Sequence, residues 1–222
     1  MHTMKNIIII GIIIIIGVLW FIFDRNSLTA IQLRELRVKN AGQEEKPAEV
    51  KTEKTDMQKG NEKNPIVVLK TNKGDISIEL FMDTMPVTAG NFLKLAKEDF
   101  YDGVKFHRVI KDFMLQGGDP NSKGDDKSSY GTGGPGYTIK DEFVPGNANN
   151  RGTISMANAG PDTGGSQFFV NLKNNDFLND KHPVFGKVVE GMDVVDTIGT
   201  TETDAGDLPV EAVVIKDIEV KE

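Results

Sequence analysis

Two segments of the 222-residue chain have the residue types and spacing of known ligand-binding loops. Gly131 to Gly136 reads GTGGPG and matches the G-x-G-x-x-G pattern of dinucleotide-binding turns. That pattern binds a pyrophosphate between a strand and a helix, whereas this copy follows a polar loop, contains a proline and precedes a β-like stretch. Asp119 opens a second segment like a calcium loop, but Lys123 stands at a ligand position and Tyr130 replaces the bidentate glutamate. Neither segment therefore predicts a cofactor or a metal ion.

The other reactive side chains do not form a known catalytic motif. Cysteine is absent, which excludes disulfides, thiolate nucleophiles, Cys-ligated zinc and iron–sulfur clusters. The three histidines, His2, His107 and His182, lack the spacing of a metal motif such as H-E-x-x-H, and no serine lies in a G-x-S-x-G elbow. The usual hydrolases and metalloenzymes are thus excluded, and we expect no cofactor.

The charge is distributed unevenly along the chain, whose formal net charge is -7. Residues 1–64 carry 10 basic and 8 acidic side chains, whereas residues 65–222 carry 16 basic and 25 acidic ones. A domain this acidic is repelled by a phosphate backbone, so nucleic acid is not an expected partner. Its acidic surface is explained by solubility alone.

Residues 7–23 form an apolar segment that follows a short N-terminal flank, residues 1–6. The 17 residues IIIIGIIIIIGVLWFIF contain no charge, and as a helix they would span about 25 Å, close to the thickness of a bilayer core. Trp20 and Phe21 near its end fit an interfacial belt. A cleaved signal sequence is the alternative, but the A-x-A-like pattern is missing, because Leu28 stands two residues before Ala30. Ile7–Phe23 therefore predicts a single-pass membrane anchor.

The flanking charges predict the orientation and the residues that follow predict a tether. Lys5 precedes the apolar segment, which places the N-terminus inside the cell and the bulk of the chain on the extracytoplasmic side. Residues 24–40 form a juxtamembrane segment in which Ser27 would cap a short helix. Residues 41–64 contain no aromatic residue and almost no large apolar one, so they predict a flexible charged linker.

From residue 65 to the C-terminus, short apolar runs alternate with turn residues. Residues 66–69 and 76–80, joined through Asn72-Lys73-Gly74, predict a β-hairpin. Asp83 or Thr84, followed by Pro86, predicts the start of a helix. Further runs cover residues 105–110, 113–116, 153–156, 167–172, 184–189 and 213–220. Two helices and about eight short strands without a βαβ repeat predict a mainly β domain, an antiparallel barrel or sandwich.

Three segments of this domain together resemble the cyclophilins. Residues 106–120 read FHRVIKDFMLQGGDP, residues 152–172 read GTISMANAGPDTGGSQFFVNL, and residues 177–196 read FLNDKHPVFGKVVEGMDVVD. They occur in the family's order and at similar spacing. The resemblance, to a bacterial-like membrane-anchored member, implies a peptidyl-prolyl cis/trans isomerase with a closed eight-stranded antiparallel β-barrel capped by two α-helices.

The resemblance also implies the residues of the site. Arg108 would be the catalytic residue. An apolar floor and walls for the proline ring would come from Phe113, Met114, Phe169 and Leu178. The substrate backbone would be held by Gln116, Ala157, Asn158 and Gln167, with His182 at the rim. Phe177 would also bind substrate. Phe177 stands where many eukaryotic cyclophilins have tryptophan, which speaks against tight binding of cyclosporin. Taken singly, these residues have ordinary explanations: core aromatics, a solvated arginine and structural polar groups.

These residue types suit the isomerisation of an Xaa-Pro bond. Rotation about this bond crosses a barrier of roughly 20 kcal/mol because twisting destroys amide resonance, and no bond is made or broken. A catalyst must therefore bind the twisted amide better than the planar forms. Twisting makes the prolyl nitrogen a better hydrogen-bond acceptor, and a positioned arginine, always charged, would bond to it most strongly in the transition state.

The expected function is thus proline isomerisation during the folding of exported proteins. Its partners would be proline-containing polypeptides and, through Ile7–Phe23, the membrane. Nothing resembling a heptad repeat predicts assembly, so we expect a monomer. Two alternatives remain at this point: a module that binds proline segments, or acts as a holdase, with little catalysis, and a secreted isomerase released by cleavage.

Overall fold

The computed structural model describes residues 64–221. The predicted membrane anchor at residues 7–23, the juxtamembrane segment at 24–40 and residues 41–63 of the predicted linker lie outside the described residues. Within residues 64–221, no helix has the length and apolar character needed to cross a bilayer.

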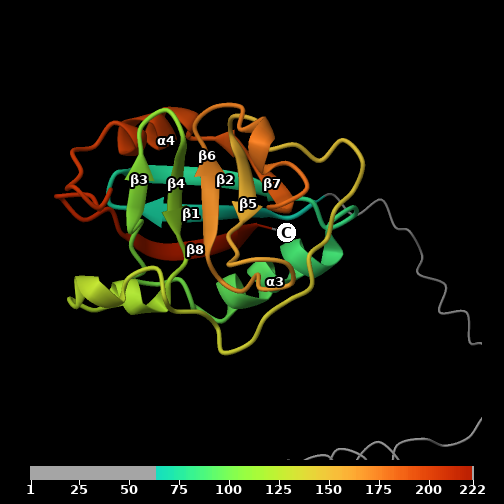
Figure 1. Cartoon of the computed structure of the whole chain (residues 1–222), viewed down its shortest axis with the longest axis horizontal. Coiled ribbons are helices and arrows are strands. Elements are labelled where there is room, and N and C mark those ends of the chain that lie inside the picture. The colour runs from blue at the N-terminus through green and yellow to red at the C-terminus, as the bar shows by residue number, and fades with distance from the viewer. Residues whose placement is uncertain (1–63, 222) are drawn as a thin grey trace, which may run out of the picture. The chain divides into compact units, whose positions relative to one another are not determined.

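The described residues form one eight-stranded antiparallel sheet, curled into a half-barrel, with two α-helices (Figure 1). The strand order is β3-β4-β6-β5-β7-β2-β1-β8. In chain order the strands are β1 (Ile66–Thr71), β2 (Gly74–Leu80), β3 (Arg108–Ile110), β4 (Met114–Gly117), β5 (Thr153–Met156), β6 (Phe168–Asn171), β7 (Val184–Glu190) and β8 (Ile215–Lys221). The helices are α3 (Pro86–Lys97) and α4 (Met192–Gly199), with short 3₁₀ helices η1 (Pro120–Lys123), η2 (Lys127–Ser129) and η3 (Asp176–Leu178). The mainly β class and the two helices agree with the prediction.

The closed barrel is not confirmed. β3 and β8 end the strand order and share no ladder in the described part of the chain. Their ends are joined instead by one isolated bridge, Lys105 to Val214, and by backbone hydrogen bonds between residues 103–106 and 213–215. β3 has only three residues, which is too short to pair along the seven residues of β8.

The β1–β2 hairpin forms where the alternation predicts it. Thr71 pairs with Gly74, so Asn72 and Lys73 are the two turn residues. Ile76, Ile78 and Leu80 are fully buried in β2, while Asp75 on the other side is exposed. The period of two therefore places one face of the hairpin in the core.

Helix α3 begins after Met85, not at the predicted cap Asp83 or Thr84. Pro86 occupies the first turn as expected, because its missing N–H would have no helical partner. The carboxylate of Glu142 accepts hydrogen bonds from the backbone N–H groups of Val87 and Thr88, at 3.1 and 3.0 Å. Glu142, 54 residues from Thr88 in sequence, therefore caps the helix in place of a local N-cap side chain.

Phe92 of helix α3 lies at the centre of the core. Its ring lies 5.0 Å from Tyr101, 5.3 Å from Phe185 and 5.4 Å from Phe168, between ring centroids. All four rings are fully buried. This aromatic cluster attaches the helix to strands β6 and β7, and truncation of such a ring costs about 3–5 kcal/mol.

Candidate active site

Strands β3, β4, β6 and β5 carry two neighbouring rows of paired residues with opposite orientations. One row runs across the inner face and joins the hydrophobic core: Val109, Leu115, Val170 and Ile154. The next row runs across the outer face: Arg108, Gln116, Phe169 and Ser155. Because side chains alternate along a strand, the register that buries the first row turns the second away from the core.

A cavity of about 170 Å³ lies on this outer face. Its lining contains nine of the eleven residues predicted for the site: Arg108, Phe113, Met114, Gln116, Ala157, Asn158, Phe169, Leu178 and His182. The structure therefore brings residues from three distant segments of the sequence to one place. Gln167 and Phe177 stand outside this lining.

The walls of the cavity are apolar. Met114 and Phe169 are 2% and 5% exposed, and Phe113 and Leu178 are half-buried. Phe177 is 61% exposed and stacks on Phe113, with ring centroids 5.7 Å apart. Phe177 thus supports a wall from outside and covers less of the cavity than a buried side chain would.

His182 closes the rim in a fixed orientation. Its Nδ1 lies 3.1 Å from the carbonyl oxygen of Met156, so Nδ1 carries the proton and donates it. Its ring meets Phe169 edge-on at 5.4 Å. Backbone and aromatic contacts together place the imidazole beside the cavity.

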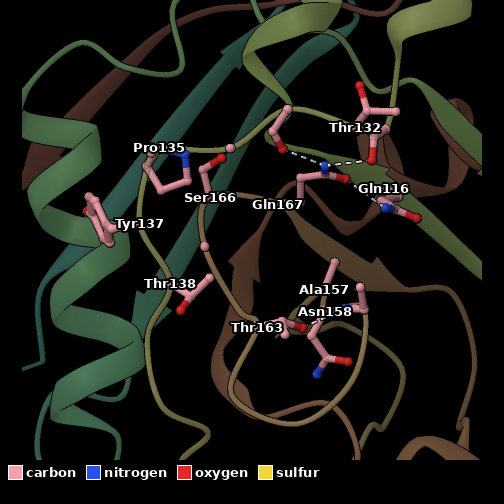
Figure 2. A pocket seen from close by; sticks show the side chains of 16 residues that line it. Gln116, Thr132, Pro135, Tyr137, Thr138, Ala157, Asn158, Thr163, Ser166 and Gln167 are labelled. Atoms are coloured by element: carbon pink, nitrogen blue, oxygen red, sulfur yellow. Dashed lines mark hydrogen bonds between the residues drawn. The ribbon is translucent and has the colours of Figure 1, made fainter. Parts of the chain in front are cut away.

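A chain of hydrogen bonds from the glycine-rich loop holds the side-chain amides of Gln167 and Gln116. Gln167 Nε2 donates to the carbonyl oxygens of Gly131 and Gly133, at 3.0 and 2.9 Å, and Gln167 Oε1 accepts from Gln116 Nε2 at 3.0 Å (Figure 2). Asn158 Nδ2 donates to the carbonyl of Lys181 at 2.8 Å. The G-x-G-x-x-G segment therefore lies beside the site as backbone support for Gln167.

A second cavity has a volume of about 590 Å³. Figure 2 shows the residues that line it. Gln116, Ala157 and Asn158 line both cavities, whereas Gln167 lines only the second. The glycine-rich loop from Gly131 to Thr138 forms its other side. The two cavities therefore meet at these three shared residues.

Among residues 64–221, Arg108 is the one arginine or lysine that lines the first cavity. Its side chain is 45% exposed, and its Nε lies 3.5 Å from Oδ2 of Asp207. Asp207 belongs to the turn that precedes β8, and nothing in the sequence marked it. The arginine can therefore face the cavity while an acidic side chain contacts it from the other side.

His107, next to Arg108, is buried and plays no part in the cavity. It is 7% exposed, and neither ring nitrogen has a hydrogen-bond partner within the described residues. Burial lowers the pKa of His107, and the carboxylate of Asp119 opposes this only in part. His107 is therefore a buried side chain outside the lining of this cavity.

A buried polar network supports the cavity, and sequence reasoning missed it. Its four fully buried members are Asn149, Ser155, Asn171 and Asn175. Asn175 Nδ2 donates to Asn171 Oδ1 at 2.8 Å and to the carbonyl of Phe113 at 3.0 Å. Ser155 Oγ donates to Asn149 Oδ1 at 2.7 Å. The only signal for the network was a polar residue, Asn171, ending the apolar run of β6.

Comparisons with known proteins agree with this architecture. The family described as "Cyclophilin type peptidyl-prolyl cis-trans isomerase/CLD" matches residues 66–220. "Peptidyl-prolyl cis-trans isomerase-like 1" of Rhizopus delemar is 49% identical over 142 residues, which cover 64% of this chain and 84% of the relative. "Probable peptidyl-prolyl cis-trans isomerase A" of Mycobacterium leprae is 42% identical over 175 residues, covering 71% of this chain and 92% of the relative.

A solved structure shows the same fold. A cyclophilin-type peptidyl-prolyl cis-trans isomerase of Cryptosporidium parvum, crystallised in the presence of the dipeptide Ala-Pro, matches with a TM-score of 0.65 and 35% identity. The match covers 71% of this chain and 99% of that structure. With the family match across residues 66–220, the chain belongs to the cyclophilin-type peptidyl-prolyl cis-trans isomerases.

Proposed function

We propose that this isomerase accelerates Xaa-Pro isomerisation in exported polypeptides, with Arg108 stabilising the twisted prolyl amide. The observation that carries the proposal is the position of Arg108 at an apolar cavity lined by Phe113, Met114 and Phe169. The dipeptide present with the similar C. parvum enzyme contains the same Xaa-Pro unit.

Each part of the cavity would have a separate task. The apolar walls would take the pyrrolidine ring, which is favourable because burying apolar surface releases it from water. Gln116 and Asn158, held by Gln167 and Lys181, would grip the flanking backbone of the peptide. Held on both sides, the substrate can rotate only about the bond between them.

Arg108 would then discriminate between the planar and the twisted amide. A planar prolyl nitrogen shares its lone pair with the carbonyl and accepts hydrogen bonds poorly. As the bond twists, the lone pair localises, and a guanidinium N–H beside the cavity gains an acceptor. An interaction made only in the transition state raises kcat and leaves KM largely unchanged.

The site of action would be the outer face of a membrane. The support is the sequence of Ile7–Phe23, 17 apolar residues without a charge, followed by a charged, aromatic-free segment up to residue 64. Such a tether would let a monomeric domain reach newly exported chains near the bilayer. Fractionation of cells, followed by protease treatment of intact cells, tests this: recovery in the soluble cytosolic fraction would contradict it.

The experiment for the catalytic role measures the cis-to-trans rate of a short Ala-Pro peptide with the full chain in detergent. We expect Arg108→Ala to lose most of the acceleration and Arg151→Ala to keep it. Arg151 is a matched control, because its side chain is also 45% exposed and also pairs with an aspartate, Asp196. Full activity of Arg108→Ala would refute the arginine mechanism. If the unsubstituted chain bound the peptide without accelerating it, the binding-module alternative would replace the proposal.

A further inference from the structure

The turn before β8 presents a carboxylate to Arg108. Asp207 Oδ2 lies 3.5 Å from Arg108 Nε, and the side chain of Asp207 is 43% exposed. Within residues 64–221, no other carboxylate lies within the 4.0 Å of an ion pair from this guanidinium. The distance exceeds that of an ordinary N–H···O bond, so the carboxylate acts on the arginine mainly through charge.

The turn that carries Asp207 has a fixed shape. Thr203 and Pro209 form a bridge across it, and Asp204 Oδ1 accepts hydrogen bonds from the backbone N–H groups of Gly206 and Leu208, at 2.8 and 3.1 Å. Asp207 itself has a φ of 63°, a left-handed conformation that aspartate and asparagine adopt more readily than most residues. The backbone from which the carboxylate projects is therefore fixed.

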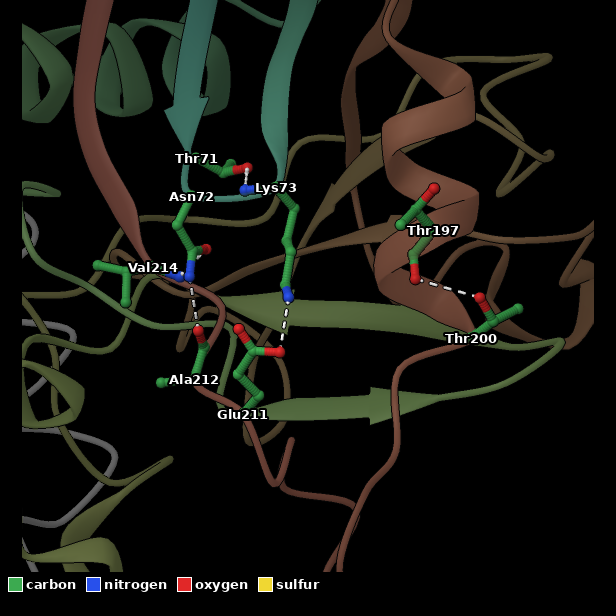
Figure 3. Close-up of polar contacts among 8 residues, drawn as sticks. All are labelled: Thr71, Asn72, Lys73, Thr197, Thr200, Glu211, Ala212 and Val214. Carbon is green, nitrogen blue, oxygen red and sulfur yellow. Dashed lines mark hydrogen bonds and ion pairs between the residues drawn. The ribbon is translucent and has the colours of Figure 1, made fainter.

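The same turn is tied to the strand that carries the arginine. The backbone N–H of Val109, the residue after Arg108, donates to the carbonyl of Asp207 at 2.8 Å. Further along, Asn72 in the β1–β2 turn bonds the carbonyl of Ala212 at 2.8 Å and the N–H of Val214 at 2.9 Å (Figure 3). The turn is thus held at its centre and at its exit, so the two charged side chains start from backbones that are fixed relative to each other.

This arrangement restrains the arginine on one side only. The carboxylate contacts Nε, and the terminal nitrogens of Arg108 make no hydrogen bond within the described residues. An exposed arginine otherwise samples many rotamers, and ordering it at each catalytic event costs conformational entropy. A fixed charge beside Nε favours the rotamers whose terminal N–H groups remain available to the cavity.

We propose that Asp207 is a positioning residue for Arg108, a role that rests on the proposed function of Arg108. Two alternative roles of the Asp207 carboxylate predict different kinetics for a variant that lacks it. A plain surface ion pair would contribute to stability alone, and a charge that weakens the field of the arginine would slow the reaction. The kinetic consequences of removing the carboxylate separate the three.

The test compares Asp207→Asn, Arg108→Ala and the double variant, as full chains, in the Xaa-Pro peptide assay. Asparagine keeps the size of the side chain and tolerates the left-handed backbone, so the turn should be preserved. Asp196→Asn is the matched control, because Asp196 pairs with Arg151 on the surface and its side chain is 47% exposed. Circular dichroism melting curves of all variants report whether the fold is intact.

We expect Asp207→Asn to lower kcat by about two- to fivefold with KM unchanged, the range of an exposed ion pair acting in the transition state. High salt should shrink this difference, and Asp196→Asn should have no effect. In the Arg108→Ala background, Asp207→Asn should cause no further loss, because the aspartate acts through the arginine.

Three results would overturn the proposal. An unchanged or higher kcat in Asp207→Asn would show that the carboxylate does not assist Arg108. An equal further loss in the Arg108→Ala background would show that it acts independently of the arginine. Full activity in Arg108→Ala alone would refute the catalytic role of Arg108, and the positioning role with it. In the first two cases the proposed function of Arg108 stands.

Discussion

Asn171→Ala should destabilise the domain far more than its small change in volume indicates. Asn171 is fully buried at the end of β6, on the face that carries the cavity. Its Nδ2 donates to Thr153 Oγ1 at 2.9 Å and to Ser155 Oγ at 3.2 Å, while its Oδ1 accepts from Asn175 at 2.8 Å. The substitution removes these three hydrogen bonds, together with two longer ones from Nδ2 to Asn149 Oδ1 at 3.4 Å and to the carbonyl of Thr153 at 3.5 Å.

The expected loss of unfolding free energy depends on the hydrogen bonds that the partners of Asn171 retain in the variant. Ser155 Oγ still donates to Asn149, Thr153 Oγ1 still donates to a backbone carbonyl, and Asn175 Nδ2 still donates to Phe113. No partner is stripped of every bond, so the cost is about three net hydrogen bonds plus a small cavity, or about 2–4 kcal/mol.

Denaturant unfolding of the full chain, followed by circular dichroism, measures this loss. Asn174→Ala is the matched control: Asn174 is exposed and accepts one hydrogen bond, from the backbone of Arg151 at 3.0 Å. Its loss should stay below about 1 kcal/mol. Because Asn175 precedes η3, which carries Leu178, Asn171→Ala should also raise KM. Equal unfolding midpoints for the two variants would refute the view that the network holds the cavity.

Two further outcomes follow from backbone conformation and from burial. Gly118→Ala should lose more than about 3 kcal/mol or fail to fold, because Gly118 has a φ of +87° and an added Cβ would lie 2.3 Å from the carbonyl oxygen of Ser166. Gly134→Ala, with nothing within 4 Å, should change unfolding by less than about 0.5 kcal/mol, and similar losses in both would contradict the structure. Burial lowers the pKa of His107, so the unfolded chain binds this proton more tightly, and stability should fall as the pH drops below about 6.5. His107→Gln should flatten that part of a pH series of unfolding free energies; an unchanged slope would exclude His107 as its source.

The local patterns predicted the strands well because their causes are local. Alternation and turn residues located the β1–β2 hairpin, and the run at residues 153–156 coincides with β5. The start of α3 was wrong by one or two residues because its cap, Glu142, comes from a loop far along the chain. A closed barrel was expected, yet the short β3 meets the segment before β8 only through an isolated bridge. Contacts between distant loops leave no periodic signal in a sequence.

The residues of the site also separate into those that a local sequence motif predicts and those that depend on distant contacts. Nine predicted residues line one cavity, since three recognisable segments carry them. Asp207 and the network around Asn171 escaped prediction because their side chains act through other side chains rather than through a motif. Phe177, predicted to bind substrate, lies largely exposed against Phe113 and outside the lining of the cavity.

Core and cavity are specified together by one register. Val109 and Leu115 are paired on the inner face, and their neighbours Arg108 and Gln116 are paired on the outer face. A slip of β4 by one residue would turn Leu115 outward and Gln116 into the core, which would destroy packing and site in the same step. The hydrophobic effect that fixes the core therefore also fixes the face of the sheet from which Arg108 projects. It does not determine the rotamer of this exposed side chain. We propose that the charge of Asp207, on the neighbouring turn, restricts that rotamer.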